Sequence, residues 1–279
     1  MIKTIVFNGG LGNQMFQYAF YLALKARIPR SIYLFDVEHS QTCHQGYEID
    51  RAFNIDSLKQ VTNYGRLKRH MPSFLRRFHV VRQKESLKFE QDVFFGNGLL
   101  TRYEGFWQSE KYFGNIVSKV RDAFTFREES LNDQTKELCK CLEIDKDSFY
   151  VSLHIRRGDY LLEEEKRGLC SLTYYENAMA FIQRQVENPV FVIFSDDIKW
   201  VKKNIHAEKC KYVDWNEGSD SWQDMLLMSR CHHNIIANST FSWWGAWLNA
   251  HPEKKVLAPK HWFLDRDNFD VLPDGWVLI

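Results

Sequence analysis

The chain has 279 residues, 44% of them hydrophobic, and a formal net charge of +1 at pH 7. That length is enough to bury one large α/β core or two modest ones. The nearly balanced charge gives no sign of nucleic-acid binding. No apolar run is long enough to cross a bilayer, and no small-residue cleavage site follows an apolar region at the N-terminus. The sequence therefore predicts neither a membrane anchor nor a signal peptide.

The N-terminal half opens with a β-α-β pattern. Residues 2–7 read as an apolar strand, a glycine-rich turn follows, and residues 13–27 have the apolar spacing of a helix. A second expected strand over 31–35 ends at Asp36. This order indicates a Rossmann-like unit.

The glycine-rich turn also has a second interpretation. A turn of this kind, with an acidic residue 24 positions after Gly12 at Asp36, is typical of NAD-dependent oxidoreductases. The spacing of that motif fails here, because Met15 stands where its third glycine belongs. The oxidoreductase is therefore the weaker alternative.

A charged stretch over 127–148, with leucines at helical spacing, separates the two halves. We place the domain boundary there, with one domain over residues 1–145 and another over residues 146–279. The second half alternates between strands and helices and predicts another Rossmann-like sheet. Its expected strands are 149–154, 190–194, 212–215, 233–237 and 254–258, and its expected helices are 174–187, 222–230 and 241–250.

Three expected strands of the second half end in polar clusters. The clusters are His154 with Arg156 and Arg157, Ser195 with Asp196 and Asp197, and Asn238 with Ser239 and Thr240. In open α/β sheets, ligands bind outside the carboxyl ends of the strands. Two guanidinium groups suit a phosphate or diphosphate, and the N-terminus of the helix that follows the third cluster suits the same ligand. The sequence thus predicts an anion site at this edge.

Two of these clusters also have a purely structural interpretation. Arg157 can form a surface ion pair with Asp159. Asn238, Ser239 or Thr240 can act only as a helix N-cap. The residues alone leave both alternatives open, although three polar clusters at one edge favour the anion site.

The chain resembles glycosyltransferase family 11, the α-1,2-fucosyltransferases, and its bacterial members in particular. The segments His154 to Asp159, Ser195 to Asp197 and Asn238 to Gly245 look like the three motifs of that family. The opening from Gly9 to Ala19 and the segment from Gly105 to Phe113 match as well. These matches keep their order over nearly the whole chain.

The resemblance implies an α/β fold of the GT-B-like kind, with two Rossmann-like domains facing a cleft and GDP held mainly by the C-terminal one. It implies inverting, metal-independent transfer of L-fucose from GDP-β-L-fucose to the 2-hydroxyl of a terminal galactose in a glycan. No cofactor is then required, and the partners are GDP-fucose and the galactose-terminated acceptor. A nucleotide-sugar-binding or glycan-binding protein without transfer activity is the non-catalytic alternative.

The matching motif positions give the candidate donor site. Arg156 is expected to stabilise the charge that grows on GDP, with Asp159 fixing its guanidinium plane. Asp197 is expected to accept hydrogen bonds from guanine. The full set expected at GDP-fucose is His154, Arg156, Arg157, Ser195, Asp196, Asp197, Asn238, Ser239, Thr240, Phe241, Gly10, Asn13 and Gln14.

The acceptor is expected to meet the N-terminal domain through Trp107 and Gln108, although Trp107 also fits a core position. The sequence does not identify the general base that would take the proton of the acceptor hydroxyl. The candidates are Asp36, His44 and Glu48.

No metal site is expected. The two Asp-x-Asp pairs, at 145–147 and 265–267, lie among charged residues and not at strand ends. The adjacent carboxylates Asp196 and Asp197 point in different directions, so they do not form such a pair.

A basic stretch over 66–88 has apolar residues between its charges. It fits an amphipathic surface that contacts anionic lipid, which would suit a lipid-linked acceptor. It also fits an ordinary pair of solvated helices interrupted at Pro72. The resemblance to bacterial members implies a cytoplasmic protein, peripheral at the inner face of the membrane if 66–88 makes that contact.

Overall fold

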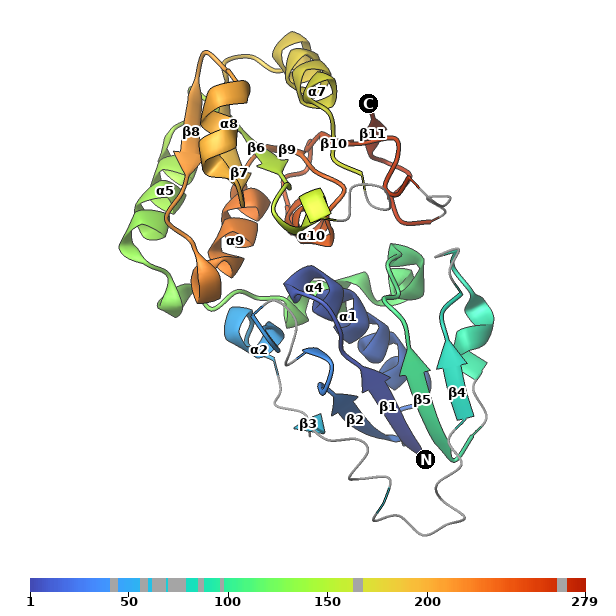
Figure 1. Cartoon of the computed structure of the whole chain (residues 1–279). Helices are drawn as coiled ribbons and strands as arrows, with labels where there is room; N and C mark the ends of the chain where they lie inside the picture. Colours follow the sequence, from blue (N-terminus) through green and yellow to red (C-terminus); the bar gives the residue numbers. More distant parts are fainter. Residues whose placement is uncertain are drawn as a thin grey trace. The chain divides into compact units, whose positions relative to one another are not determined.

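The computed structural model describes residues 1–40, 45–55, 60–61, 69, 79–84, 88–95, 98–162, 168–264 and 270–279. The chain forms two compact units (Figure 1). The first runs from Met1 to Arg127 and takes in Asp270 and Val271, and the second takes the rest from Glu128 onward. Each unit is a parallel sheet with helices packed against it, so the predicted α/β class is confirmed.

The first unit has a five-stranded sheet in the order β3-β2-β1-β5-β4, and all its paired strands are parallel. Its strands are β1 (Ile2–Val6), β2 (Ile32–Asp36), β3 (Gln60–Val61), β4 (His79–Arg82) and β5 (Leu100–Glu104). Its helices are α1 (Leu11–Arg27), α2 (Ile49–Ala52) and α4 (Val117–Ala123), with 3₁₀ turns η3 (Gln91–Phe95), η4 (Glu110–Tyr112) and η5 (Gly114–Ile116). The predicted β-α-β opening is confirmed.

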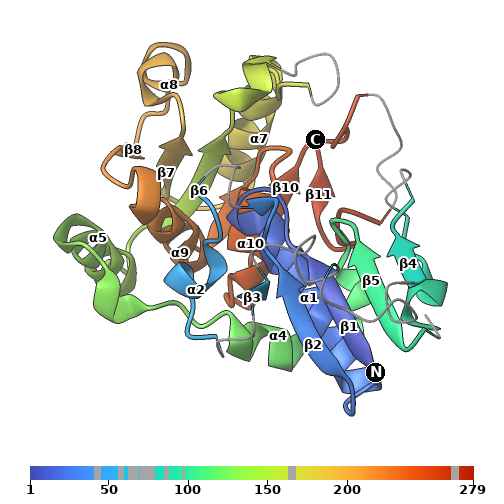
Figure 2. The same ribbon diagram turned by 60° about the horizontal axis from the view of Figure 1, so that its bottom comes forward.

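Helix α1 lies along β1 on one face of this sheet (Figure 2). Tyr18 and Tyr21 of α1 contact the Phe35 ring edge to face, and Phe20 contacts Tyr103 of β5 in the same way. Such pairs contribute about 0.5–1.5 kcal/mol each beyond the burial of their area. The aromatic face of α1 therefore fixes the helix across β1 and both of its neighbours.

The second unit has a six-stranded parallel sheet in the order β11-β10-β9-β6-β7-β8. Its strands are β6 (Phe149–Ile155), β7 (Pro189–Ser195), β8 (Cys210–Val213), β9 (His233–Ile235), β10 (Val256–Ala258) and β11 (Val277–Leu278). Its helices are α5 (Asp133–Ile144), α7 (Leu172–Gln185), α8 (Ile198–Asn204), α9 (Trp222–Arg230) and α10 (Thr240–Leu248), with 3₁₀ turns η6 (Glu128–Ser130), η7 (Asp159–Leu162) and η8 (Gly218–Asp220). Counted from β6, this is the strand order of the Rossmann fold.

The core of the second unit is built around β6. Val151, Leu153 and Ile155 of this strand share one buried cluster with Ala178 and Ile182 of α7. Because parallel sheets are covered on both faces, β6 is buried from its second residue to its last. The strand that carries the predicted arginine motif is therefore enclosed over nearly its whole length.

The two units divide between Arg127 and Glu128, whereas the sequence placed the boundary between residues 145 and 146. The difference is helix α5, which packs against α9 of the second unit. Leu138 and Leu142 on the apolar face of α5 are buried. Leucine spacing predicts such a helix, but it does not tell which sheet the helix joins.

The expected strands and helices of the second half are confirmed, with ends shifted by a few residues. The helices and strands that sequence analysis missed are short or charged, namely α2, β3, β4, β5, α4, α8 and β11. In the basic stretch 66–88, His79–Arg82 form strand β4 beside β5 and not part of a helix. The β-branched Val80 and Val81 explain this preference.

Most of the rest of the basic stretch lies outside the described residues, and the membrane contact proposed for it stays a prediction. In the described ranges, no helix combines the length and the apolar character needed to cross a bilayer.

Each sheet has a topological switch point beside its first strand. In the first sheet the chain passes from β1 to β2 and β3 on one side, and β5 then occupies the other side. In the second sheet it passes from β6 to β7 and β8, and β9 occupies the other side. Open α/β sheets bind ligands at such points, which here are β1/β5 and β6/β9.

Candidate functional site

The switch point of the second sheet brings together the ends of β6 and β9. The strands pair in register at Val151 with His233 and at Leu153 with Ile235, so the segments that follow them leave the sheet side by side. Strand β7 pairs with β6 on its other side. The three polar clusters predicted from the sequence therefore meet at one edge.

Arg156 directly follows β6 and lies between two carboxylates. Its Nη2 is 2.7 Å from Asp159 Oδ1, and its Nη1 is 3.1 Å from Asp196 Oδ2. Its Nε is buried and has no hydrogen-bond partner among the described residues. An unpaired buried N–H group costs about 1–3 kcal/mol, which an anion bound at this atom would recover.

Arg157 is held by other groups. Its backbone N–H donates to Asp196 Oδ1 (2.9 Å), and its Nε is 3.3 Å from Asp197 Oδ2. The ion pair of Arg157 is therefore with Asp197 and not with Asp159. The guanidinium carbon lies 3.7 Å from the centre of the Trp200 ring, a cation–π contact. Sequence analysis missed Trp200, although its place three residues after Asp197, in the first turn of α8, was a usable signal.

Asp197 is also the N-cap of α8. Its Oδ1 accepts a hydrogen bond from the Trp200 N–H (3.2 Å), and its own N–H donates to Ser195 Oγ (3.0 Å). The neighbouring Asp196 approaches Gly158 so closely that a Cβ there would lie 2.6 Å from Asp196 Oδ2. The glycine of the arginine motif thus makes room for the carboxylate that holds both arginines.

Helix α10 begins at the same switch point. Ser239 is its N-cap, and its Oγ accepts a hydrogen bond from the Phe241 N–H (3.4 Å). The N-cap interpretation from the sequence is confirmed. It does not exclude an anion, because one cap leaves other N–H groups of the first turn unsatisfied. Thr240 and Phe241, which open the helix, are partly exposed.

Asn238 forms hydrogen bonds with the chain segments around the site. Its Nδ2 donates to the carbonyl oxygens of Gly168 (3.0 Å) and Trp262 (3.2 Å), and its Oδ1 accepts from Cys170 Sγ (3.4 Å). The Tyr160 hydroxyl donates to its backbone oxygen (3.0 Å). These contacts support a positioning role, and direct contact of Asn238 with a donor stays a prediction.

His154 is buried at the end of β6, with its ring centre 5.9 Å from that of Phe241. Burial, followed by the positive charge of Arg156, lowers its pKa to about 3. The imidazole is therefore neutral at physiological pH and is poorly suited to accept a proton there. Its Nδ1 has no hydrogen-bond partner in the described part of the chain.

The anion site expected at this edge stays a prediction, and Arg156 is the group best placed to serve it. A guanidinium group has five N–H donors, so Arg156 can keep both carboxylates and still donate to a phosphate. The dipole of α10 adds positive potential at the same edge. Among the residues that the structure describes, no group of three or more His, Cys, Asp or Glu side chains is placed to hold a metal ion.

The two Asp-x-Asp pairs do not alter this description. Asp145 accepts hydrogen bonds from the Tyr150 hydroxyl (2.9 Å) and the Asp147 N–H (3.0 Å), as a residue in a turn does. The pair at 265–267 lies outside the described residues.

In the first unit, the polar residues of the opening motif fasten loops to α1. Gln14 donates to the Gly46 carbonyl (2.7 Å) and accepts from the Glu48 N–H (2.8 Å). Asn13 Oδ1 accepts from Gln108 Nε2 (2.8 Å). The motif thus connects the segments that follow β2 and β5, and a contact of this motif with the donor stays a prediction.

Glu48 lies beside the N-terminus of α1. Gly10 has no side chain to cap the helix. Burial raises the pKa of Glu48, against the smaller opposing effects of Arg51 and of the Leu11 backbone at the start of the helix.

The candidates for the general base differ in their surroundings. Glu48 is engaged at the start of α1, and Asp36 is fully buried and paired with Arg102. His44 lies outside the described residues. The assignment of the base stays open among them.

Trp107 is fully buried. Its ring stacks on Phe20 with centroids 4.1 Å apart, and it meets Tyr112 edge to face. Its Nε1 and the Oε1 of Gln108 lack hydrogen-bond partners among the described residues. This geometry supports the core interpretation of Trp107, and contact of Trp107 or Gln108 with an acceptor stays a prediction.

Residues 1–277 match the model of glycosyl transferase family 11. An alpha-1,2-colitosyltransferase from Escherichia coli is 37% identical, over 97% of this chain and 96% of its own length. The O-antigen biosynthesis glycosyltransferase WbnK from the same organism is 32% identical, over 97% and 98%. The galactoside alpha-(1,2)-fucosyltransferase 1 of Leontocebus fuscicollis is 27% identical, over 88% of this chain and 65% of its own length.

Solved structures resemble the fold at low sequence identity. The NodZ alpha-1,6-fucosyltransferase soaked with GDP-fucose has a TM-score of 0.52 at 13% identity, over 88% of this chain and 92% of its own. The ADP-heptose lps heptosyltransferase II of E. coli has a TM-score of 0.52 at 12% identity, over 100% and 90%. These neighbours are GT-B glycosyltransferases, so the GT-B class predicted for this chain is confirmed.

Proposed function

The chain belongs to glycosyltransferase family 11 and is a glycosyltransferase, and on that premise we propose that it transfers L-fucose from GDP-β-L-fucose to the 2-hydroxyl of a terminal galactose. The observation that carries this proposal is Arg156, whose buried Nε has no partner among the described residues, at the switch point where α10 begins. Two similar proteins support the choice of sugar, because one relative is a galactoside α-(1,2)-fucosyltransferase and one structural neighbour was soaked with GDP-fucose.

The chemistry of the proposal is inversion at the anomeric carbon. The bond from this carbon to the β-phosphate oxygen breaks, and its electron pair leaves with GDP. The acceptor oxygen forms the new bond on the opposite face and gives up its proton to a base. The largest electrostatic demand is the charge that grows on the diphosphate, which donors at the site must stabilise.

In this proposal the protein supplies that stabilisation without a metal. Arg156 donates to the phosphates, and Asp159 and Asp196 fix the plane of its guanidinium group. Ser239 and Thr240 at the start of α10 hold the diphosphate from the other side. The two arginines and the helix end are the groups that would replace the usual divalent cation.

In this proposal, the guanine base of the nucleotide is recognised at the N-terminus of α8. Asp197 lies at its N-terminus, next to the layered pair of Arg157 and Trp200. A carboxylate accepts hydrogen bonds from guanine N1–H and its amino group, and a base can stack on a guanidinium plane.

A colitosyl donor is the second candidate, because a colitosyltransferase is 37% identical over nearly the whole chain. A galactose-terminated acceptor suits either donor. The lipid-linked form of the acceptor and a membrane contact through 66–88 belong to the same proposal.

The test is an assay with purified protein, a β-galactoside acceptor and one of three donors: GDP-fucose, GDP-colitose or GDP-mannose. Each reaction is run with and without excess EDTA, and the product linkage and anomeric configuration are read by NMR. The proposal expects an α-1,2-fucosylated product that persists in EDTA.

The other outcomes separate the alternatives. Preference for the colitosyl donor would replace fucose as the sugar. Loss of activity in EDTA with rescue by manganese would overturn the metal-independent mechanism. Tight GDP binding without any transfer would favour the non-catalytic alternative.

A further inference from the structure

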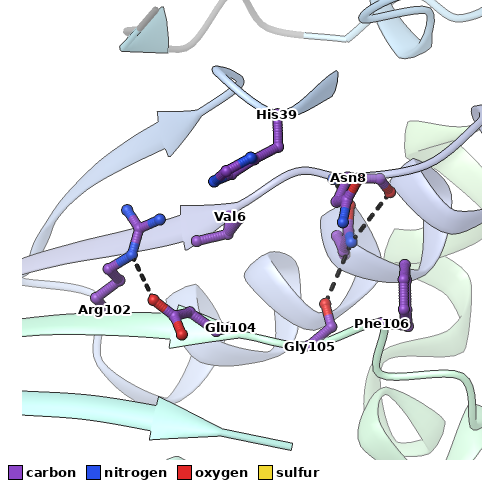
Figure 3. A pocket seen from close by; sticks show the side chains of 8 residues that line it. Val6, Asn8, His39, Arg102, Glu104, Gly105 and Phe106 are labelled. Carbon is purple, nitrogen blue, oxygen red and sulfur yellow. Dashed lines mark hydrogen bonds and ion pairs between the residues drawn. The ribbon is translucent and has the colours of Figure 1, made fainter. Parts of the chain in front are cut away.

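The first unit contains a cavity of about 240 Å³ at the carboxyl edge of its sheet (Figure 3). Its walls come from the ends of β1 and β5, from the segment after β2 and from α1. The residues that matter for its chemistry are Asn8, His39, Arg102, Glu104, Gly105 and Phe106. None of the donor residues predicted from the sequence lines it.

This cavity lies at the switch point β1/β5. It is the counterpart in the first sheet of the β6/β9 point that holds the arginine site. The ligand rule for open α/β sheets applies to both sheets. We therefore expect a ligand at the first switch point as well.

The turn after β5 directs Phe106 toward the cavity. Trp107 has a φ of +55°, a left-handed conformation that costs a tryptophan about 1–3 kcal/mol. Gln83 Oε1 supports the turn by accepting from the N–H groups of Phe106 (2.9 Å) and Trp107 (2.8 Å). A Cβ at Gly105 would lie 2.6 Å from Gln83 Cβ, so the turn requires glycine. The turn buries the indole and leaves Phe106 37% exposed at the cavity.

Helix α1 holds the same turn from the other side. Gln17 Nε2 donates to the Gly105 carbonyl (3.2 Å), and Gln17 Oε1 accepts from the Asn8 N–H (3.0 Å). Figure 3 shows the hydrogen bond that ends on the Gly105 carbonyl oxygen. These hydrogen bonds hold the backbone of the turn that carries Phe106.

The opposite wall is polar. Arg102 and Glu104 alternate with Tyr103 along β5, so both point toward the cavity while Tyr103 packs on α1. Burial would raise the pKa of Glu104, but hydrogen bonds from Arg102 and Arg82 outweigh it and the pKa lies below its usual range. Glu104 is therefore a permanent carboxylate, a strong acceptor for hydroxyl groups.

The size of the cavity favours a single sugar ring over a nucleotide sugar. Pockets for drug-sized ligands have about 300–1,000 Å³. A cavity of about 240 Å³ is smaller and fits one sugar ring.

We propose that this cavity binds the terminal pyranose ring of the acceptor, with Phe106 against its apolar face and Glu104 accepting a hydrogen bond from one of its hydroxyls. The inference rests on the proposed function, because that function supplies the galactoside. It assigns the aromatic contact to Phe106 in place of the buried Trp107.

The test measures acceptor binding directly and in turnover. Saturation-transfer NMR with methyl β-galactoside is expected to show contact through the ring protons of the apolar face, and Phe106→Ala is expected to abolish it. In turnover, the same variant is expected to raise the acceptor KM about tenfold. Its GDP affinity by calorimetry is expected to stay within a few-fold.

Two variants complete the design. Phe95→Ala is the matched control, since Phe95 is an exposed phenylalanine of the same unit outside the cavity, and it is expected to behave like wild type. Phe106→Leu keeps the apolar volume without the aromatic face. If the melting temperature of Phe106→Ala falls, the leucine variant decides, and it is expected to show the same loss of acceptor contact.

The outcomes separate the cavity from the proposed function. Galactoside contact in the NMR experiment that is lost in the Phe106 variants, without fucosyl transfer by wild type, supports the cavity and refutes the function. Normal transfer with an unchanged acceptor KM and an unchanged NMR contact in both Phe106 variants overturns the cavity. Absence of galactoside contact in wild type overturns it as well.

Discussion

Arg102 lies within β5 of the first unit, and Arg156 directly follows β6 of the second. Each belongs to a strand beside the switch point of its sheet, and each lies between two carboxylates. Arg102 pairs with Asp36 and Glu104 with 11% of its side chain exposed, whereas 25% of Arg156 is exposed. Arg156 also has a buried N–H group without a partner among the described residues.

This difference assigns the two arginines to different tasks. A buried ion pair that loses one partner leaves an uncompensated charge, so Arg102 belongs to the stability of its unit. Arg156 is partly exposed and has an unused N–H donor. Its loss should change the stability of the unit little but should weaken the binding of an anion. Burial and completeness of pairing, not residue type, separate the structural from the chemical group.

The largest expected effect is on stability. Arg102→Met should lower the free energy of unfolding by about 3–5 kcal/mol, because it leaves the fully buried Asp36 carboxylate without its cation. Chemical denaturation measures this loss. Arg82→Met is the matched control, since it removes the other partner of Glu104 from an exposed position, and it should cost less than about 1 kcal/mol. Equal losses in the two variants would break the comparison.

The next effect is on catalysis. Arg156→Lys keeps the charge but loses the planar fork, so kcat at saturating donor should fall about a hundredfold, or by about 3 kcal/mol. Its denaturation midpoint should stay close to that of wild type, unlike that of Arg102→Met. Near-wild-type turnover would remove Arg156 from the mechanism.

A smaller effect is expected on nucleotide binding. Asp197→Asn keeps an acceptor at the N-cap of α8 but removes the charge that pairs with Arg157 and is proposed to read guanine. GDP affinity measured by calorimetry should fall about tenfold, with little change in kcat once donor is saturating. An unchanged affinity would show that Asp197 serves the helix and not the base.

The smallest effect concerns the dependence of stability on pH. Burial, followed by the neighbouring His232 and His251 and by Lys255, lowers the pKa of His233 to about 4. In the unfolded chain, the His233 imidazole binds a proton near pH 6.5, whereas in the folded chain it stays neutral down to about pH 4. The second unit should therefore lose stability as the pH falls from 6.5 to 4.

Hydrogen exchange locates that loss. Amides of β9 should lose protection over this pH range more than amides of β1 do. His233→Asn keeps an acceptor for the Lys255 N–H and should reduce the difference. The part that remains is expected from His154, whose pKa is lowered to about 3. A variant with the same pH slope as wild type would show that His233 is not the group responsible.

The sequence predicted the second unit better than the first, for a physical reason. Its strands are continuous apolar runs, which are easy to recognise in a sequence. The rule that ligands bind at carboxyl strand ends then predicted that Arg156, Asp196 and Asn238 lie at one edge of the sheet. The contacts Arg156–Asp196 and Tyr160–Asn238 bear out that juxtaposition. The rule could not tell which polar groups face a ligand and which hold a loop, as Asn238 does.

In the first unit, the direction in which an aromatic side chain faces depends on single backbone torsion angles. The motif matched from Gly105 to Phe113 contains two adjacent aromatic residues, and sequence analysis named only Trp107 as an acceptor contact. The left-handed conformation of Trp107 turns its indole into the core and Phe106 toward the cavity, which no sequence pattern shows. Strand β5 was missed because Arg102 and Glu104 conceal its apolar alternation.

The carboxylate of Glu48 at the start of α1 has a consequence for how many nucleotides one chain can take. Both units contain the strand-turn-helix arrangement that suits phosphate, but in the first the buried Glu48 side chain already lies at the start of the helix. A group tethered to the chain acts at an effective concentration in the millimolar range. Glu48 is therefore an intramolecular competitor for a phosphate at that helix end.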